Sequence, residues 1–141
     1  MRRFKWSKAN EVFIPEVDAE HRNLFQLADG LQAVVLAKAD ATQVQEALRA
    51  LIAAIDDHFS FEERRMRSAH YPQYAWHKQL HDTVRKRARL FVPRIESGDR
   101  EAAMLLLEFL SAWLMDHTAL ADRMMGAYLR NYDRAQVALA S

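Results

Sequence analysis

Histidines and carboxylates recur at helical spacing in several parts of this 141-residue chain. His58 and Glu62 lie four residues apart in HFSFEERRM, a stretch that otherwise favours helix. Two helical residues at this spacing lie one above the other on the same face. Alone, such a pair is more typical of a solvated surface, where it contributes little. The flanking Leu51, Ile55 and Met66 indicate instead that this face is buried.

Three further segments carry comparable groups. His77 and His81 are also four residues apart, in WHKQLHD, and two histidines at this spacing can bind one metal ion together. His117 and Asp122 lie in DHTALAD, directly after the apolar run LLLEFLSAWL. His21, in VDAEHRNLF, borders a stripe of leucines and valines. All of these residues are therefore expected to face the interior.

Together these groups predict a metal centre. A buried histidine or carboxylate without a partner is costly, and a bound cation would compensate several of them at once. Five imidazoles and two carboxylates exceed the need of one ion, but they suit two ions about 3.5 Å apart that share carboxylates. The chain has no cysteine, so thiolate ligands are excluded, and a mixture of N and O ligands favours iron over zinc. We predict a non-haem di-iron centre, in which the remaining histidine, His70, has no role.

The elements that must position these residues are helices. Apolar residues recur at a spacing close to 3.6 almost everywhere, and only three glycines and three prolines interrupt the chain. We predict an extended N-terminal arm and four helices, at about 1–17, 18–38, 42–67, 72–96 and 100–130. Long helices with short connections favour one domain over residues 1–141, an all-α antiparallel up-down-up-down four-helix bundle. Such bundles hold cofactors between facing helices.

Local signals define the predicted helix ends. Asp18 is a favourable N-cap for the first helix. Thr42 and Gln45 have the spacing of a capping box for the second. Pro72 suits the start of the third helix, whereas Pro93 is expected to kink or fray its final turn.

The arm and the last helix carry weaker signals. Trp6, Phe13 and Ile14 are the apolar residues expected to anchor the arm. The last helix is expected to be irregular near Thr118 and to be followed by a short tail after Asn131.

Composition excludes several classes of protein. Twenty basic residues against nineteen acidic ones give a net charge of +1, which argues against a nucleic-acid binder. The longest apolar run, MLLLEFLSAWLM, is too short to span a bilayer and contains Glu108, and the basic N-terminus lacks the apolar core of a signal peptide. We expect a cytoplasmic protein with no nucleic-acid or membrane partner.

Four motifs in combination resemble the hemerythrin family, in particular its single-domain bacteriohemerythrins. They are I-P-x-V-D-x-x-H (14–21), H-F-x-x-E-E (58–63), Y-P-x-x-x-x-H-x-x-x-H (71–81) and W-L-x-x-H-x-x-x-x-D (113–122). All seven ligand positions of the family are filled here by the family's residue types. The resemblance implies that one iron is bound by His77, His81 and His117, the other by His21 and His58, and that Glu62 and Asp122 bridge them.

The resemblance also implies a function. The second iron is one ligand short, so O2 would bind end-on at this open position as a peroxide-level species, beside a solvent-derived oxo or hydroxo bridge between the irons. The expected O2 pocket consists of Leu24, Phe59, Trp113, Leu114 and Thr118. The family commonly has an aliphatic residue at the last of these positions, and a threonine hydroxyl there could hydrogen-bond O2 or admit water. Neutral imidazoles with only two carboxylates favour O2 binding over turnover, so an enzyme is not expected.

Two alternatives remain open at this point. One is a sensor that uses the same centre to report O2, redox state or iron to a separate protein partner. The other is a di-iron peroxidase or nitric oxide reductase. Reversible spectra on exposure to O2 would indicate a carrier or sensor, whereas multiple turnovers with peroxide or NO would indicate an enzyme.

Overall fold

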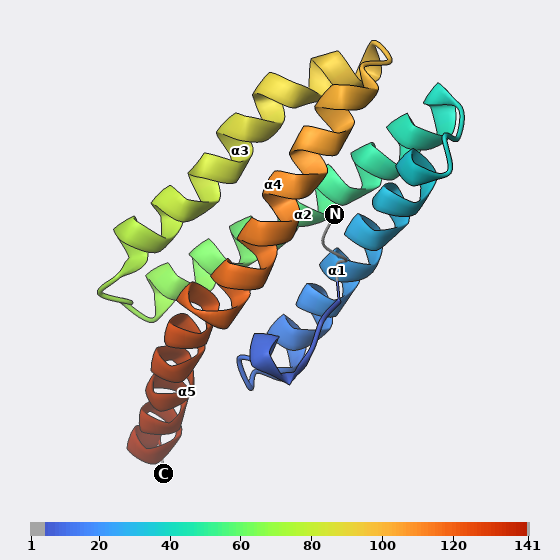
Figure 1. Ribbon diagram of the computed structural model, residues 1–141. Helices are drawn as coiled ribbons and strands as arrows, with labels where there is room; N and C mark the ends of the chain where they lie inside the picture. Colours follow the sequence, from blue (N-terminus) through green and yellow to red (C-terminus); the bar gives the residue numbers. More distant parts are fainter. Residues whose placement is uncertain (1–4, 141) are drawn as a thin grey trace.

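A computed structural model describes residues 5–140 (Figure 1). In this range the chain forms a short 3-10 helix and five α-helices, and no strand. The elements are η1 (Lys8–Asn10), α1 (Pro15–Leu36), α2 (Ala41–Ser68), α3 (Tyr74–Glu96), α4 (Arg100–Ala119) and α5 (Ala121–Ala140).

The helices α1 to α4 form an antiparallel bundle (Figure 1). α1 packs on α2, α2 on α3, α3 on α4, and α4 closes the bundle against α1. The buried core between them is made largely of leucines, isoleucines and valines, with Phe25 and Phe59 as its aromatic members. Each helix places an apolar stripe inward, as its 3.6-residue periodicity requires. The predicted fold class, an all-α four-helix bundle, is confirmed.

The first two helices begin earlier than their sequence signals indicate. α1 starts at Pro15, whose missing N–H costs nothing at the first helical position. The carboxylate of Asp18 instead accepts hydrogen bonds from the backbone N–H groups of Val12 (2.8 Å) and Phe13 (3.2 Å). For α2, Asp40 rather than Thr42 is the N-cap and accepts a hydrogen bond from the N–H of Gln43 at 2.9 Å. Both expected caps are therefore wrong.

The prolines at the two ends of the predicted third helix also depart from expectation. Pro72 lies in the turn before the helix, which begins at Tyr74. The helix continues through Pro93 to Glu96, so its final turn is not frayed. Pro93 has no N–H to donate to the carbonyl of Arg89, four residues earlier. Arg89 is exposed, so water can satisfy that carbonyl.

The last predicted helix is divided in two. Leu120, with φ −114° and ψ −73°, separates α4 from α5. α5 then continues to Ala140, so the expected tail after Asn131 is helical, and its end reaches past the rest of the bundle (Figure 1). The segment DRAQVALA contains good helix formers and neither glycine nor proline, which explains this continuation.

The N-terminal segment packs against the junction of α4 and α5. Val12 is fully buried and Ile14 nearly so, whereas Phe13 is 55% exposed and is not the anchor that its size suggests. Gly126 permits this packing, because a Cβ there would lie 2.8 Å from the carbonyl oxygen of Val12. Asn10, also buried, donates to the Thr118 hydroxyl at 2.8 Å. The arm is thus tied to the helices that carry two of the candidate metal ligands.

One stretch, Arg100–Ala140, is long and apolar enough to cross a membrane by length and composition. Its apolar residues Leu106, Leu107, Leu110 and Leu114 are buried in the bundle core, which accounts for this composition.

Candidate metal centre

Each of the five α-helices places at least one of the seven candidate ligands in the interior. α1 carries His21, α2 carries His58 and Glu62, α3 carries His77 and His81, α4 carries His117, and α5 carries Asp122. None of these residues is more than 6% exposed. Charged and polar side chains at this depth require compensation.

The seven side chains fall into two groups that share both carboxylates. One group is Glu62, His77, His81, His117 and Asp122, and the other is His21, His58, Glu62 and Asp122. Within each group the possible ligand atoms lie within 4.8 Å of one another. The structure therefore brings together all seven residues that the sequence singles out, and His70 lies apart from them, exposed in the turn between α2 and α3.

Each carboxylate presents one oxygen to each group. Oε1 of Glu62 lies 3.1 Å from Nε2 of His81 and 3.5 Å from Nε2 of His77. Its Oε2 lies 2.8 Å from Nε2 of His58 and 3.3 Å from Nε2 of His21. This arrangement is that of a bridging carboxylate between two ions.

Asp122 repeats the pattern. Its Oδ1 lies 2.9 Å from Nε2 of both His77 and His117, and its Oδ2 lies 3.1 Å from Nε2 of His21. Two carboxylates thus face two sets of imidazoles, three on one side and two on the other.

Most of these close contacts do not have the geometry of hydrogen bonds, which distinguishes a metal site from a hydrogen-bond network. Despite the short distances, the Nε2 atoms of His58, His77, His81 and His117 have no hydrogen-bond partner of acceptable geometry among the described residues. Oε1 of Glu62 and Oδ1 of Asp122 are likewise without one. Buried polar atoms that converge without bonding one another fit a pair of cations bound between them, with the N and O donor set that iron accepts.

Without metal, protons compensate the charge. Burial lowers the pKa of His21 and His58, but the opposing effects of the nearby carboxylates are together larger and raise these pKa values to about 9 and about 10. Burial also lowers the pKa of His77, but its short contacts with the carboxylates of Asp122 and Glu62 outweigh this effect and raise the pKa to about 9. A metal ion must therefore displace protons from these rings.

The carboxylates shift in the opposite direction. Burial raises the pKa of Glu62, but the charge of His58, the hydrogen bond with His21 and the close approach of the other histidines hold it well below its usual value. The pKa of Asp122 is also well below its usual value, because His117 and His21 outweigh burial and the charge of Glu62. The pKa of His117 is lowered, mainly by burial. Two anionic carboxylates are thus kept in the bundle core.

The break at Leu120 is needed for this geometry. His117 and Asp122 are five residues apart, which on a regular helix would place them about 140° apart around the axis. With the helix interrupted between them, Nε2 of His117 lies 2.9 Å from Oδ1 of Asp122. The break in the helix thus brings two candidate ligands together.

Aromatic rings hold two of the imidazoles in place. Phe59 stacks on His81, with ring centroids 3.9 Å apart and planes 4° from parallel. Trp113 stacks on His117 at 4.1 Å. Leu24 and Leu114 are each 2% exposed, one turn from a candidate ligand on their own helices. Phe59 and Trp113 thus form apolar walls against two of the histidines. That all four residues line an O2 pocket stays a prediction.

Thr118, the fifth expected pocket residue, is buried, but its hydroxyl is already engaged. It donates to the carbonyl of Leu114 at 2.7 Å and accepts from the amide of Asn10 at 2.8 Å. A hydrogen bond from this hydroxyl to O2 would compete with the contact to Leu114, because its single hydrogen is used within α4. The hydroxyl serves to hold the N-terminal segment.

Three residues next to the centre were not singled out from the sequence. Glu20 contacts Nδ1 of His58 at 3.0 Å, and Glu63 contacts Nδ1 of His81 at 2.8 Å. Arg85 contacts Glu63 at 2.7 Å. The sequence offered a signal only for Glu63, which is the second glutamate of the H-F-x-x-E-E motif. The contacts of Glu20 and Arg85 depend on how the helices pack.

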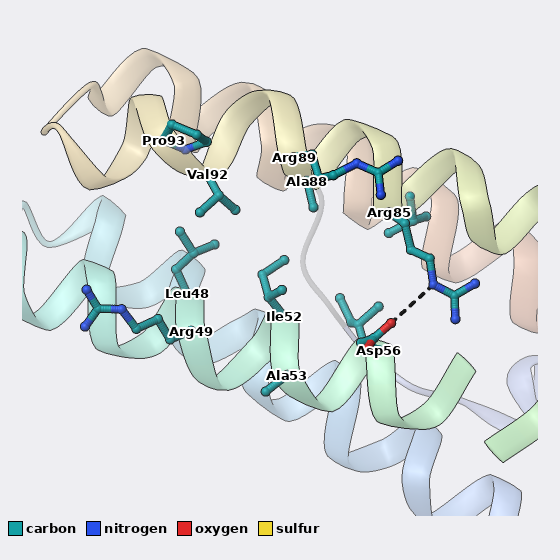
Figure 2. A pocket seen from close by; sticks show the side chains of 12 residues that line it. Leu48, Arg49, Ile52, Ala53, Asp56, Arg85, Ala88, Arg89, Val92 and Pro93 are labelled. Carbon is teal, nitrogen blue, oxygen red and sulfur yellow. Dashed lines mark hydrogen bonds and ion pairs between the residues drawn. The ribbon is translucent and has the colours of Figure 1, made fainter. Parts of the chain in front are cut away.

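A large groove on the described surface lies away from this cluster. It has a volume of about 640 Å³ and runs between α2 and α3, where Leu48 and Ile52 face Val92 (Figure 2). None of the seven candidate ligands lines it. A second groove of about 620 Å³, between α3 and the α4–α5 junction, reaches Trp113 and His117. This second groove thus meets the cluster at His117, in the three-histidine group.

Comparisons with known proteins agree with this site. Residues 12–129 match the family model described as the hemerythrin HHE cation binding domain. A bacteriohemerythrin of Aquifex aeolicus is 32% identical over 84% of this chain and 88% of its own length. A bacteriohemerythrin of Ralstonia nicotianae is 32% identical over 89% of this chain and 88% of its own length. A myohemerythrin of Theromyzon tessulatum is 27% identical over 81% of this chain and 83% of its own length. The chain belongs to the hemerythrin family.

Proposed function

We propose that this protein is a non-haem di-iron protein that binds O2 reversibly, for carriage, storage or delivery. The observation that carries the proposal is the bridging geometry: Glu62 and Asp122 each direct one oxygen to a group of three histidines and the other toward the remaining two. A metal ion at the position with fewer protein ligands would have room for a small molecule to bind.

The same distances support our assignment of ligands. His77, His81 and His117 would hold one iron, His21 and His58 would hold the other, and Glu62 and Asp122 would be shared by both. An iron pair bound there would supply the redox chemistry for reversible O2 binding. The protein supplies five neutral donors and two anionic ones, so few carboxylates are free to rearrange during a reaction.

The apolar walls favour binding over turnover. We assign the O2 pocket to Leu24, Phe59, Trp113, Leu114 and Thr118. Apart from the engaged hydroxyl of Thr118 and the indole N–H of Trp113, these side chains offer apolar surface, which excludes water and provides no proton donor at the open position. We also propose that the protein acts in the cytoplasm without nucleic acid or membrane, and that O2 is its ligand.

The test combines metal analysis with spectroscopy. The purified protein is expected to contain two irons per chain, and the air-exposed form to show oxo-bridge and peroxide-to-iron absorption bands. These bands should vanish under vacuum or argon and return with O2 through several cycles.

Rapid mixing with peroxide or NO separates the alternatives. Catalytic consumption of many equivalents per chain would contradict the carrier proposal. Failure to bind two irons would contradict the assignment of ligands.

A further inference from the structure

The five candidate histidine ligands differ in how their outer ring nitrogens are held. Nδ1 of His81 lies 2.8 Å from Oε2 of Glu63, and Nδ1 of His58 lies 3.0 Å from Oε1 of Glu20. Nδ1 of the other three has no hydrogen-bond partner among the described residues. A carboxylate at Nδ1 places the ring proton there and leaves the lone pair of Nε2 for a metal.

The two carboxylates are not equivalent. The Glu20 side chain is 38% exposed, whereas that of Glu63 is only 9% exposed. Glu63 is held by Arg85, whose Nη1 lies 2.7 Å from Oε2 and whose Nη2 lies 3.4 Å from Oε1. A buried carboxylate fixed by an arginine has little freedom to turn away from the imidazole.

Arg85 is itself fixed by further contacts. Its Nε lies 3.2 Å from Asp56 and its Nη1 lies 3.0 Å from Asp82. Figure 2 shows the guanidinium at the edge of the α2–α3 groove, joined to Asp56. Arg85 also lies 5.3 Å above the ring of Phe59, which stacks on His81. Arg85 thus supports both Glu63, at the edge of the His81 ring, and Phe59, on the face of that ring.

We propose that Glu63 and Arg85 are positioning residues for His81, which together fix its tautomer and its orientation toward the metal in the three-histidine group. The proposal rests on the proposed function, because it presupposes that His81 is a metal ligand. It predicts that the metal position of His77, His81 and His117 depends on Glu63, and that the position of His21 and His58 does not.

The experiment uses Co²⁺ as the probe, titrated into metal-free full-length protein against a competing chelator. Glu63→Gln is expected to weaken one of two Co²⁺ sites by about 10- to 100-fold and to leave the other within about threefold. Arg85→Met, which keeps the aliphatic stem at a partly exposed position, is expected to weaken the same site. Glu63→Asp should recover part of the affinity, and Glu46→Gln, the same change at an exposed position of α2, should leave both sites unchanged.

A second readout separates positioning from general damage. In the Co²⁺ protein, the ring N–H protons of ligand histidines give shifted, exchangeable NMR signals. Glu63→Gln is expected to move one such signal and to speed its exchange with water. If Glu63→Gln does not fold, Arg85→Met carries the same test.

The possible failures are distinguishable. A parent protein that does not bind two Co²⁺ ions would contradict the proposed function. A parent that binds two, with variants that keep both affinities and all N–H signals, would overturn the positioning role and leave the proposed function intact.

Discussion

At the scale of single residues, the centre depends on side chains that are expensive to bury. His58 and Glu62 are each no more than 2% exposed, and each shifts the pKa of the other toward its charged form. Removing one partner would leave a buried group without compensation, and it would also remove a metal ligand. The two iron positions should respond differently, because one has three histidines and the other two.

His58→Ala tests this difference. The position held by His21 and His58 would keep a single histidine, so we expect loss of that iron and of O2 binding, while the three-histidine position retains metal. Iron content per chain and the absorption bands of the air-exposed protein measure the result. His70→Ala is the matched control, since His70 is exposed outside the cluster, and it should retain both irons. Equal O2 binding by His58→Ala and the parent would contradict the assignment.

Thr118→Val tests the role of a buried hydroxyl. The change removes the acceptor of Asn10 while preserving the shape of the side chain. We expect a loss of about 1–2 kcal/mol in the free energy of unfolding, because the buried amide then lacks its best partner.

Thr83→Val is the control for this measurement. Thr83 also donates to a carbonyl four residues earlier, within α3, but it is exposed. Urea titration of both variants should show a clear loss only for Thr118→Val. Losses of the same size would mean that the contact with Asn10 contributes nothing.

At the scale of elements, the N-terminal segment and the α4–α5 junction form one unit. Arg123 donates to the carbonyls of Glu11 (3.0 Å) and Lys8 (2.9 Å), and Arg130 donates to that of Val12. This unit lies beside Leu120, where the helix must break for His117 and Asp122 to meet. The packing of a distant segment therefore supports the geometry of two ligands.

Two glycine substitutions are expected to have opposite effects. In Gly126→Ala the new Cβ would lie 2.8 Å from the carbonyl oxygen and 3.0 Å from the Cβ of Val12, so the N-terminal segment must shift. We expect destabilisation by about 1–3 kcal/mol, as for other overpacked sites.

Gly30→Ala is the counterpart in α1, an exposed helical position with nothing within 4 Å of the new Cβ. It is expected to stabilise the protein by about 0.5–1 kcal/mol. Thermal melts of the metal-loaded proteins measure both. A Gly126→Ala variant as stable as Gly30→Ala would show that the close approach to Val12 is not required.

At the scale of the whole molecule, protons and metal compete for one cluster. The raised pKa values of His21 (about 9), His58 (about 10) and His77 (about 9) mean that the metal-free folded protein binds more protons than the unfolded chain between about pH 6.5 and 10. This contribution to stability is fully present below about pH 6.5 and is lost as the pH rises through the folded pKa values. The lowered pKa values of Glu62 and Asp122 act in the opposite direction, and their contribution is lost as the pH falls below about 4.5.

The metal-free protein should therefore be most stable near pH 6. Its free energy of unfolding is expected to fall by at least about 1 kcal/mol between pH 6.5 and pH 9.5, the value of a single pKa unit at one group. Urea titrations of chelated protein at the two pH values measure this change.

The metal-loaded protein should behave differently over the same range. Fewer protons compete for the imidazoles at higher pH, so metal affinity should rise and stability should not fall. Metal-free protein that is equally stable at both pH values would mean that the histidines are not protonated within the cluster.

Local patterns in the sequence were enough to single out the candidate ligands and the kind of fold that carries them. Helical periodicity is local: His58 and Glu62, or His77 and His81, share a face because they are four residues apart, whatever packs against them. The apolar stripes followed in the same way, and with short connections they left an antiparallel bundle as the simplest arrangement. The predicted bundle is confirmed, and the seven candidate ligands meet in its core.

Three other features follow from tertiary packing: the division of the carboxylate oxygens between the two groups, the break in the helix and the contacts that hold the histidines. Asn10 and Thr118 are 108 residues apart and Glu63 and His81 are 18 apart, so no local pattern signals these contacts. Even the N-caps were decided this way, since Asp18 is a good cap by type but is used by the backbone of Val12 and Phe13. Local spacing fixes the direction of a side chain on its helix, and packing between distant segments fixes the atom that it meets.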